Sequence, residues 1–270
     1  YLILVSINKR IKGSVSRRLQ ALPRHSEQPS RRSFMENERK MANCAQCPIE
    51  LEERLCRKEG GKAPAGCPTR NNTQTVARAL EDIRDSKLFE FARQASIQES
   101  EGYGNRELGS DHLKPIKPRI LETAEFAHKM QYKRLGLVCC VGLCREAQKV
   151  GLFFENQGFE VVSVICKVGR VPKEDISLRD EQKILPGSPE AMCNPIAQAY
   201  VLNEAETDFN ILMGLCVGHD SLLMKHCQAM CTVLAAKDRL LGHNPLAAVY
   251  LMDSYYRALK NPQSSLDPQY

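Results

Sequence analysis

Eight of the twelve cysteines in this chain of 270 residues fall into two sets of four. The first set is crowded near the N-terminus and consists of Cys44, Cys47, Cys56 and Cys67. The second set lies where apolar segments end or a helical pattern begins, and consists of Cys140, Cys166, Cys193 and Cys216. Thiolates are preferred ligands of zinc, Cu(I) and iron–sulfur clusters, and four converging thiolates close such a site. The sequence therefore predicts two metal sites.

The N-terminal set lies in a small module rich in Gly, Pro and Cys. Cys44 and Cys47 form a CxxC pair that puts two sulfurs on one turn, and Cys56 and Cys67 complete four ligands. The segment has almost no hydrophobic periodicity, so a metal or a cross-link must organise it. Because it contains no histidine and no dense ferredoxin-type cysteine run, structural zinc and an iron–sulfur cluster both remain open.

The rest of the chain alternates between strand and helix patterns. Helical periodicity begins at Asn71 and again at Pro118, and a final apolar segment at residues 246–259 also reads as a helix. Between them we expect strands at residues 135–140, 160–166, 209–215 and 232–236, with helices at residues 143–157, at 195–205 and from Ser221. Continuous apolar strands alternating with helices are typical of an α/β fold with a mainly parallel sheet and flanking helices.

The predicted organisation has four parts. A basic leader at residues 1–40 is expected to be disordered; then come the Cys-rich metal module at 41–70, a helical segment at 71–133 and the α/β domain at 134–270. The leader holds ten Lys and Arg against three Glu, whereas the remainder holds 28 basic and 29 acidic residues. A start at Met35 or Met41, a flexible basic arm and a transit segment all fit this composition.

The charge distribution and the cysteines limit the classes of protein to which this chain can belong. Because the excess of basic residues is confined to the leader, we expect no nucleic-acid partner. No apolar run reaches the roughly 18 residues of a membrane span, so we expect no membrane partner. Reduced thiols and the lack of an export signal favour the cytoplasm.

Four expected strands end in side chains that can do chemistry. Ligands bind beyond the carboxyl ends of parallel strands, where Cys140, Cys166 and Cys216 end three strands and Lys237 ends the fourth. Cys193 joins them from the loop that opens a helix. Alternatively, these four cysteines bind no metal and are small hydrophobic side chains of the core, since free cysteine is often buried.

His219 and Lys237 are the candidates for catalysis at this edge. His219 follows Cys216 by three residues and could ligate a metal or donate a proton, while Asp220 could orient it or cap a helix. Lys237, with Arg239, could hold a small anionic ligand. The sequence contains no GxGxxG, GxSxG or Walker motif.

Five segments in combination resemble a family of uncharacterised, cysteine-rich proteins, mostly from anaerobic bacteria and archaea, described only as metal-binding. These segments are LGLVCCVGL at 135–143, CKVG at 166–169, CNPIAQA at 193–199, GLCVGHD at 214–220, and KDR at 237–239 with HNP at 243–245. The resemblance covers about residues 41–260 and leaves the leader outside. It implies that both cysteine sets bind metal, with Cys140 rather than Cys139 as the ligand, and that Cys144, Cys227 and Cys231 are departures. It implies no particular reaction.

Two functions from different classes follow. The first is a redox or electron-transfer protein of unknown reaction, in which zinc or an iron–sulfur cluster lies at the sheet edge beside His219 and Lys237. The second is a non-catalytic carrier or sensor of a metal ion or cluster, in which the thiolates are the working groups. The sequence leaves open whether the protein is an enzyme.

Overall fold

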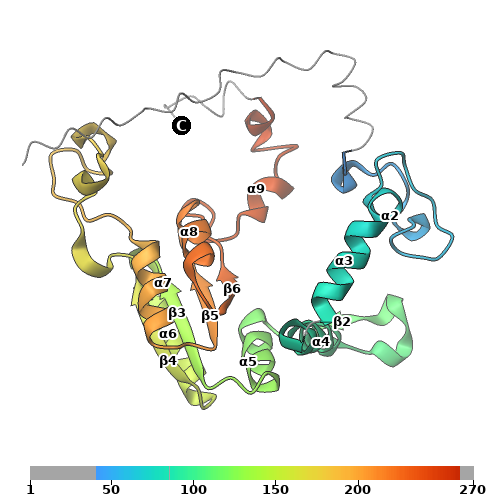
Figure 1. Cartoon of the computed structure of the whole chain (residues 1–270). Helices are drawn as coiled ribbons and strands as arrows, with labels where there is room; N and C mark the ends of the chain where they lie inside the picture. The colour runs from blue at the N-terminus through green and yellow to red at the C-terminus, as the bar shows by residue number, and fades with distance from the viewer. Residues whose placement is uncertain (1–40, 85, 262–270) are drawn as a thin grey trace, which may run out of the picture. The chain divides into compact units, whose positions relative to one another are not determined.

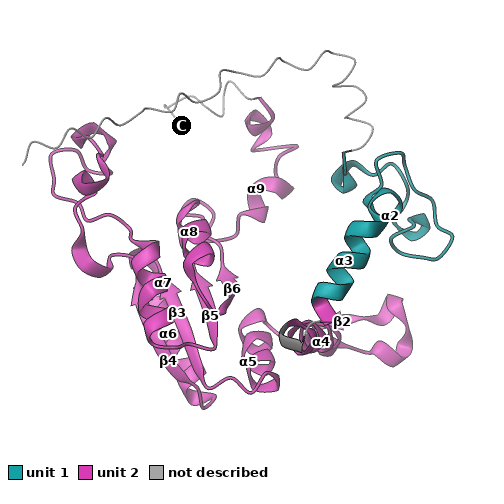
Figure 2. Cartoon of the chain, viewed as in Figure 1, with its two compact units in different colours: residues 1–82 teal, residues 83–270 magenta. Residues whose placement is uncertain are grey.

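The computed structural model describes residues 41–84 and 86–261 (Figure 1). The disorder and the alternative starts expected for residues 1–40 lie outside the described residues. The chain divides into two compact units, residues 1–82 and residues 83–270 (Figure 2). The boundary falls within the segment expected to be helical. In the described part of the chain, no helix combines the length and the apolar character needed to cross a membrane.

The described part of the first unit, residues 41–82, contains short elements and no core. Helix α2 spans Pro68–Asn71, and α3, which begins at Thr73 and ends at Arg84, crosses the boundary between the units. None of residues 41–82 is buried. The loops are instead tied by polar contacts, in which Arg54 donates to the carbonyls of Ile49 at 2.8 Å and Cys47 at 3.3 Å, and Arg70 donates to the carbonyl of Pro64 at 2.8 Å.

The second unit is built on a four-stranded parallel sheet, as the sequence predicts. The strands are β3 (Arg134–Cys139), β4 (Glu160–Ile165), β5 (Phe209–Met213) and β6 (Met230–Ala235), in the order β4-β3-β5-β6. The connecting helices are α6 (Cys144–Asn156), α7 (Pro195–Glu204) and α8 (His219–His226). Their alternation confirms the α/β class. β3 and β5 are central and buried on both faces, because helices cover both sides of the sheet.

Alternate residues of the central strands face two separate cores. On one face Leu137 and Ile211 pack with Phe126 of α5 (Arg119–Lys129) and with α6. On the other face Val138 and Leu212 pack with α7 and α8. Since successive side chains of a strand point to opposite faces, neighbouring cysteines at a strand end are separated between these two cores.

Helix α4 (Ser86–Glu101) packs on the first of these faces through α5. Phe91 of α4 lies 5.0 Å from Phe126 and 6.2 Å from Phe209 of β5, measured between ring centroids. A two-stranded ribbon of β1 (Tyr103–Gly104) and β2 (Lys114–Pro115) connects α4 to α5. By contrast, the apolar side chains of α3, such as Val76, are exposed.

The prediction of a helix at residues 246–259 is wrong for most of that segment. Only α9 (Leu246–Tyr250) is α-helical, followed by turns and a 3₁₀ segment at Arg257–Lys260. Leu246, Val249 and Tyr250 are all exposed. A helix gains most of its stability by burying an apolar face, and this one buries none, so apolar periodicity alone overestimated it.

Candidate functional site

The strand order places a topological switch point between β3 and β5. The connection from β3 leads to β4 on one side, whereas β5 lies on the other side and leads on to β6. In open parallel sheets, ligands bind outside the carboxyl ends of the strands at such a point. Cys140 follows β3 directly and Cys216 follows β5 by three residues, so these two cysteines flank it.

Cys140 and Cys166 lie together on the α7 side of the sheet. Both are buried, with exposures of 7% and 2%, and both belong to the core formed with α7 and α8. The backbone N–H of Val141 donates to the sulfur of Cys166 at 3.3 Å, which holds the end of β4 against the turn that follows β3. Cys139 packs in the opposite core, where burial raises its pKa to about 11. Cys140 is therefore the cysteine of the pair that faces Cys166.

A long loop returns Cys193 to the same place. After β4 the chain leaves the sheet and comes back through a backbone bridge between Pro172 and Ala191. The N–H of Asn194 then donates to the carbonyl of Cys166 at 2.8 Å, and the Asn194 side chain caps α7 by accepting from the Ala197 N–H at 3.1 Å. The thiols of Cys193 and Cys166 are consequently in hydrogen-bonding contact.

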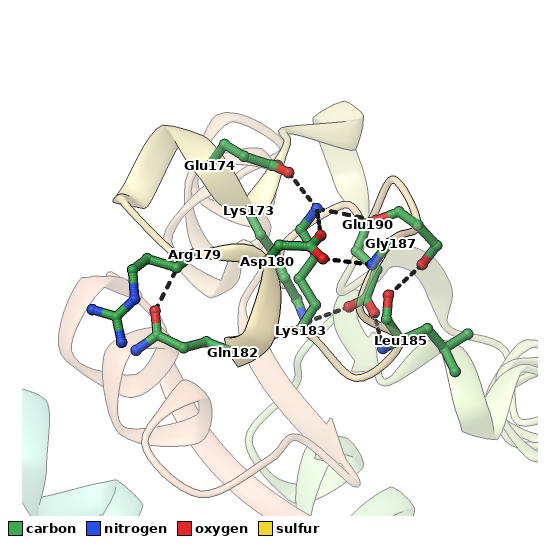
Figure 3. A network of polar contacts seen from close by, with 10 residues as sticks. Lys173, Glu174, Arg179, Asp180, Gln182, Lys183, Leu185, Gly187 and Glu190 are labelled. Atoms are coloured by element: carbon green, nitrogen blue, oxygen red, sulfur yellow. Dashed lines mark hydrogen bonds and ion pairs between the residues drawn. The ribbon is translucent and has the colours of Figure 1, made fainter.

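Ion pairs hold this loop in shape (Figure 3). The ammonium of Lys183, 7% exposed, contacts Glu174 at 2.5 Å and Asp180 at 3.0 Å, and Lys173 pairs with Glu190. The N–H of Gly187 donates to Asp180 at 2.6 Å. The loop has few buried apolar side chains, so these contacts replace a core of its own.

Among the four thiols of the site, Cys193 has the lowered pKa. The hydrogen bond from Cys166 lowers the pKa of Cys193 to about 5 against the opposing effect of burial, and the charges of Lys167 and His219 act in the same direction. The same contact with Cys193, together with burial, raises the pKa of Cys166. Lys167 is fixed by donating to the carbonyl of Ala191 at 2.5 Å. A proton shared between the two sulfurs thus leaves negative charge on Cys193.

Cys216 and His219 occupy the turn before α8. The guanidinium of Arg239 donates to the sulfur of Cys216 at 2.9 Å, and the N–H of His219 donates to the carbonyl of Cys216 at 2.9 Å. The Nδ1 atom of His219 is buried and has no hydrogen-bond partner among the described residues. The side chain of Asp220 accepts from the N–H of Ser221 at 2.8 Å, so it supports the start of α8 and does not orient His219.

Lys237 lies beside Cys140 at the Gly142 turn. A Cβ atom placed on Gly142 would stand 3.3 Å from the Lys237 ammonium and 4.0 Å from the Cys140 sulfur. The site therefore combines four thiols with the cationic side chains of Lys167, Lys237 and Arg239. The sequence patterns did not identify Lys167, because its position next to Cys193 depends on the loop that brings Cys193 back to the sheet edge.

The N-terminal cysteines share one cavity in the first unit. The cavity measures about 330 Å³, and its lining includes Cys44, Cys47, Cys56 and Cys67. A hydrogen bond from the N–H of Arg70 at the start of α2 is the largest effect on Cys67 and lowers the pKa of its exposed thiol. Four thiols around one cavity are a ligand set typical of a structural metal site. A metal would also organise a segment that has no core.

Neither thiol set is a closed coordination shell. All twelve cysteines are free, and within residues 41–84 and 86–261 no three His, Cys, Asp or Glu side chains stand close enough together to hold a metal ion. The residue types fit a metal site, because thiolates are good ligands for zinc and iron–sulfur clusters, and the four thiols of each set lie in one region. Their side chains do not converge on one point.

Cys227 and Cys231, which the resemblance implies are departures from the family pattern, lie next to each other. Their thiols are in hydrogen-bonding contact with each other, because the end of α8 and the start of β6 meet there. Their spacing of four residues across a helix end and a strand gave no sign of this. Cys144 is exposed at the start of α6.

Comparison with known proteins assigns the chain to a family without an assigned function. The sequence model of the family described as "Protein of unknown function (DUF1847)" matches residues 67–234. The chain belongs to this family. The uncharacterised protein MJ0455 of Methanocaldococcus jannaschii is similar, with 45% identity over 134 residues that make up 50% of this chain and 67% of that protein. The DUF1847 match contains Cys67 and the four sheet-edge cysteines, and it leaves Cys44, Cys47, Cys56 and Lys237 outside.

Proposed function

We propose that this chain is a metal-binding protein whose principal site is the sheet-edge thiol set, holding zinc or an iron–sulfur cluster. One observation carries the proposal: Cys193 packs in the same core as Cys140 and Cys166, with its thiol against that of Cys166, at the carboxyl edge of a parallel sheet. A metal ligand must be deprotonated, and a pKa of about 5 makes Cys193 a thiolate at neutral pH. The complete ligand set is Cys140, Cys166, Cys193 and Cys216.

The charges around the thiols support this proposal. Four thiolates around Zn²⁺ or a [4Fe–4S] cluster give a centre with net negative charge. Lys167, Lys237 and Arg239 lie next to three of the thiols and offset that charge. Because no three donors are preformed, binding requires side chains to turn toward one another, and we propose that Cys193 and Cys166 are the first two ligands.

A second site in the first unit is part of the proposal. Residues 41–82 bury no side chain, and four thiols line one cavity, so a metal supplies the cross-link that such a segment lacks. Metal-binding thiols must stay reduced, and the cytoplasm is a reducing compartment, so we propose that the protein is located there.

A redox or electron-transfer role is the proposed use of the sheet-edge metal. His219 favours it, because its buried Nδ1 atom has no partner among the described residues and its charge acts on Cys193. Such a group could move a proton next to the thiolates, while Lys237 holds a small anionic ligand. A carrier or sensor, in which the thiolates only bind, is the alternative.

Metal analysis of two matched variants tests the proposal. Wild-type protein purified without oxygen should be brown if it holds a cluster, or colourless with stoichiometric zinc. Cys193→Ser should remove one metal equivalent, whereas the same change at exposed Cys144 should remove none. Equal metal content in wild type and Cys193→Ser would refute the sheet-edge site.

A further inference from the structure

Cys227 and Cys231 form a thiol pair that the proposed metal sites do not use. Cys227 follows the last residue of α8, and Cys231 is the second residue of β6. Both pack against the core beneath α7 and α8, and both are partly exposed. Their thiols are in contact with each other.

The turn between the two cysteines is fixed by α7. The side-chain amide of Asn203 donates to the carbonyl of His226 at 2.9 Å, and its oxygen accepts from the N–H of Gln228 at 2.9 Å. The N–H of Cys227 donates to the carbonyl of Leu223 at 3.0 Å. Tertiary contacts thus hold the sulfurs together on a braced turn, which favours reaction between them over reaction with distant thiols.

A buried amide lies beside the pair. Asn210 on β5 is opposite Cys231 in the strand register and is fully buried. Its oxygen accepts from the hydroxyl of Thr207 at 2.8 Å, but its Nδ2 atom has no hydrogen-bond partner in the described part of the chain. A buried donor without an acceptor is costly. The Asn210 side chain acts on both thiols, so a thiolate at Cys227 would supply the missing acceptor.

We infer that Cys227 and Cys231 are a redox-active dithiol that exchanges with low-molecular-weight disulfides. The Cys227 thiolate attacks one sulfur of the small disulfide, forms a mixed disulfide and releases one small thiolate, which takes up a proton. The Cys231 thiol loses its proton and attacks the Cys227 sulfur, which forms the Cys227–Cys231 disulfide and releases the second small thiol. The protein loses two hydrogens and two electrons, and the small disulfide gains them.

The order of attack follows from how the two thiols affect each other. The contact with Cys231 lowers the pKa of Cys227 and raises the pKa of Cys231, and the Cys231 thiol also donates to the carbonyl of Ala229 at 3.6 Å, which holds its proton. Cys227 is therefore the attacking sulfur and Cys231 the resolving one.

Tryptic digestion isolates this pair cleanly. Cleavage after Lys225 and Lys237 gives a peptide of residues 226–237 whose only cysteines are Cys227 and Cys231. The metal-loaded full chain is incubated with increasing concentrations of oxidised glutathione, and its remaining thiols are alkylated. After digestion, the mass of the peptide is measured by mass spectrometry. We expect it to lose both alkylation sites and the mass of two hydrogens, at a disulfide concentration about tenfold below that which modifies exposed Cys144.

The variants test the order of attack. Cys231→Ser should stop at a glutathione adduct on Cys227, and Cys227→Ser should leave Cys231 unmodified under the same conditions. A peptide that stays doubly alkylated when Cys144 is fully modified would overturn the inference, as would cross-links from either cysteine to other peptides. Loss of metal from Cys227→Ser would also overturn it, because the pair would then be a ligand set. The metal proposal is judged separately by Cys193→Ser.

Discussion

A single methyl group added at Gly136 should destabilise the sheet strongly. Gly136 lies in the middle of β3, opposite Asn210 of β5, and is buried. A Cβ atom at this position would stand 2.1 Å from the Asn210 side-chain oxygen and 2.9 Å from a methyl carbon of Leu202. Neither neighbour can move freely, because Asn210 and Leu202 are fully buried between the sheet and α7.

The expected loss has two parts. Forcing a methyl group into a packed core costs about 1–3 kcal/mol. Displacing Asn210 breaks its hydrogen bond with Thr207 and leaves buried polar groups unpaired, at about 1–3 kcal/mol. Gly136→Ala should thus lower the free energy of unfolding by about 2–6 kcal/mol, and Tm by roughly 4–24 °C.

Gly151 in α6 provides the matched control. A Cβ atom there meets only Leu137, at an ordinary contact distance of 3.8 Å. Both substitutions reduce the freedom of the unfolded chain equally, so they differ only in the folded state. Gly151→Ala should raise the free energy of unfolding by about 0.5–1 kcal/mol, because alanine favours a helix interior.

Urea unfolding followed by far-ultraviolet circular dichroism measures both variants, at equal metal content. The two changes should have opposite signs. A Gly136→Ala protein as stable as Gly151→Ala would refute the packing of Asn210 over Gly136, and with it the position of the amide beside the thiol pair.

Three further predictions concern the loop and the metal sites. The hydrogen bond from Lys183 and the N–H of Gly187 lower the pKa of Asp180, so the loop gains stability above the ordinary carboxyl pKa and loses it as pH falls through the lowered one. Hydrogen-exchange protection of the Gly187 amide, corrected for its intrinsic rate, should therefore fall below about pH 4, and equal protection at pH 3 and pH 6 would contradict this. Cys47→Ser should release one metal equivalent and expose residues 41–70 to proteases, whereas unchanged metal content would exclude a site there. His219→Ala should keep its metal and fold and lose any turnover; loss of metal would make His219 a ligand.

Sequence patterns predicted the architecture of the second unit closely. The apolar runs at residues 135–140 and 209–215 became the central strands, because strands buried on both faces must be apolar throughout. The same patterns placed Cys140, Cys166 and Cys216 at strand exits. In the structure Cys139 and Cys140 face different cores, because successive side chains of a strand point to opposite faces.

Long-range contacts decided the rest. The loop between Cys166 and Cys193 carries no periodic signal, and only its ion pairs and its backbone bridge bring Cys193 to Cys166. The contact between Cys227 and Cys231 depends on Asn203 of α7, and the lowered pKa of Cys193 depends first on Cys166 and then on Lys167 and His219. The sequence by itself determined the strands of the main sheet, the helices that connect them and the strand ends that carry cysteines, because local periodicity and burial fix those features. Only the tertiary structure decided which thiols meet, because pairing across loops depends on contacts between residues far apart in the chain.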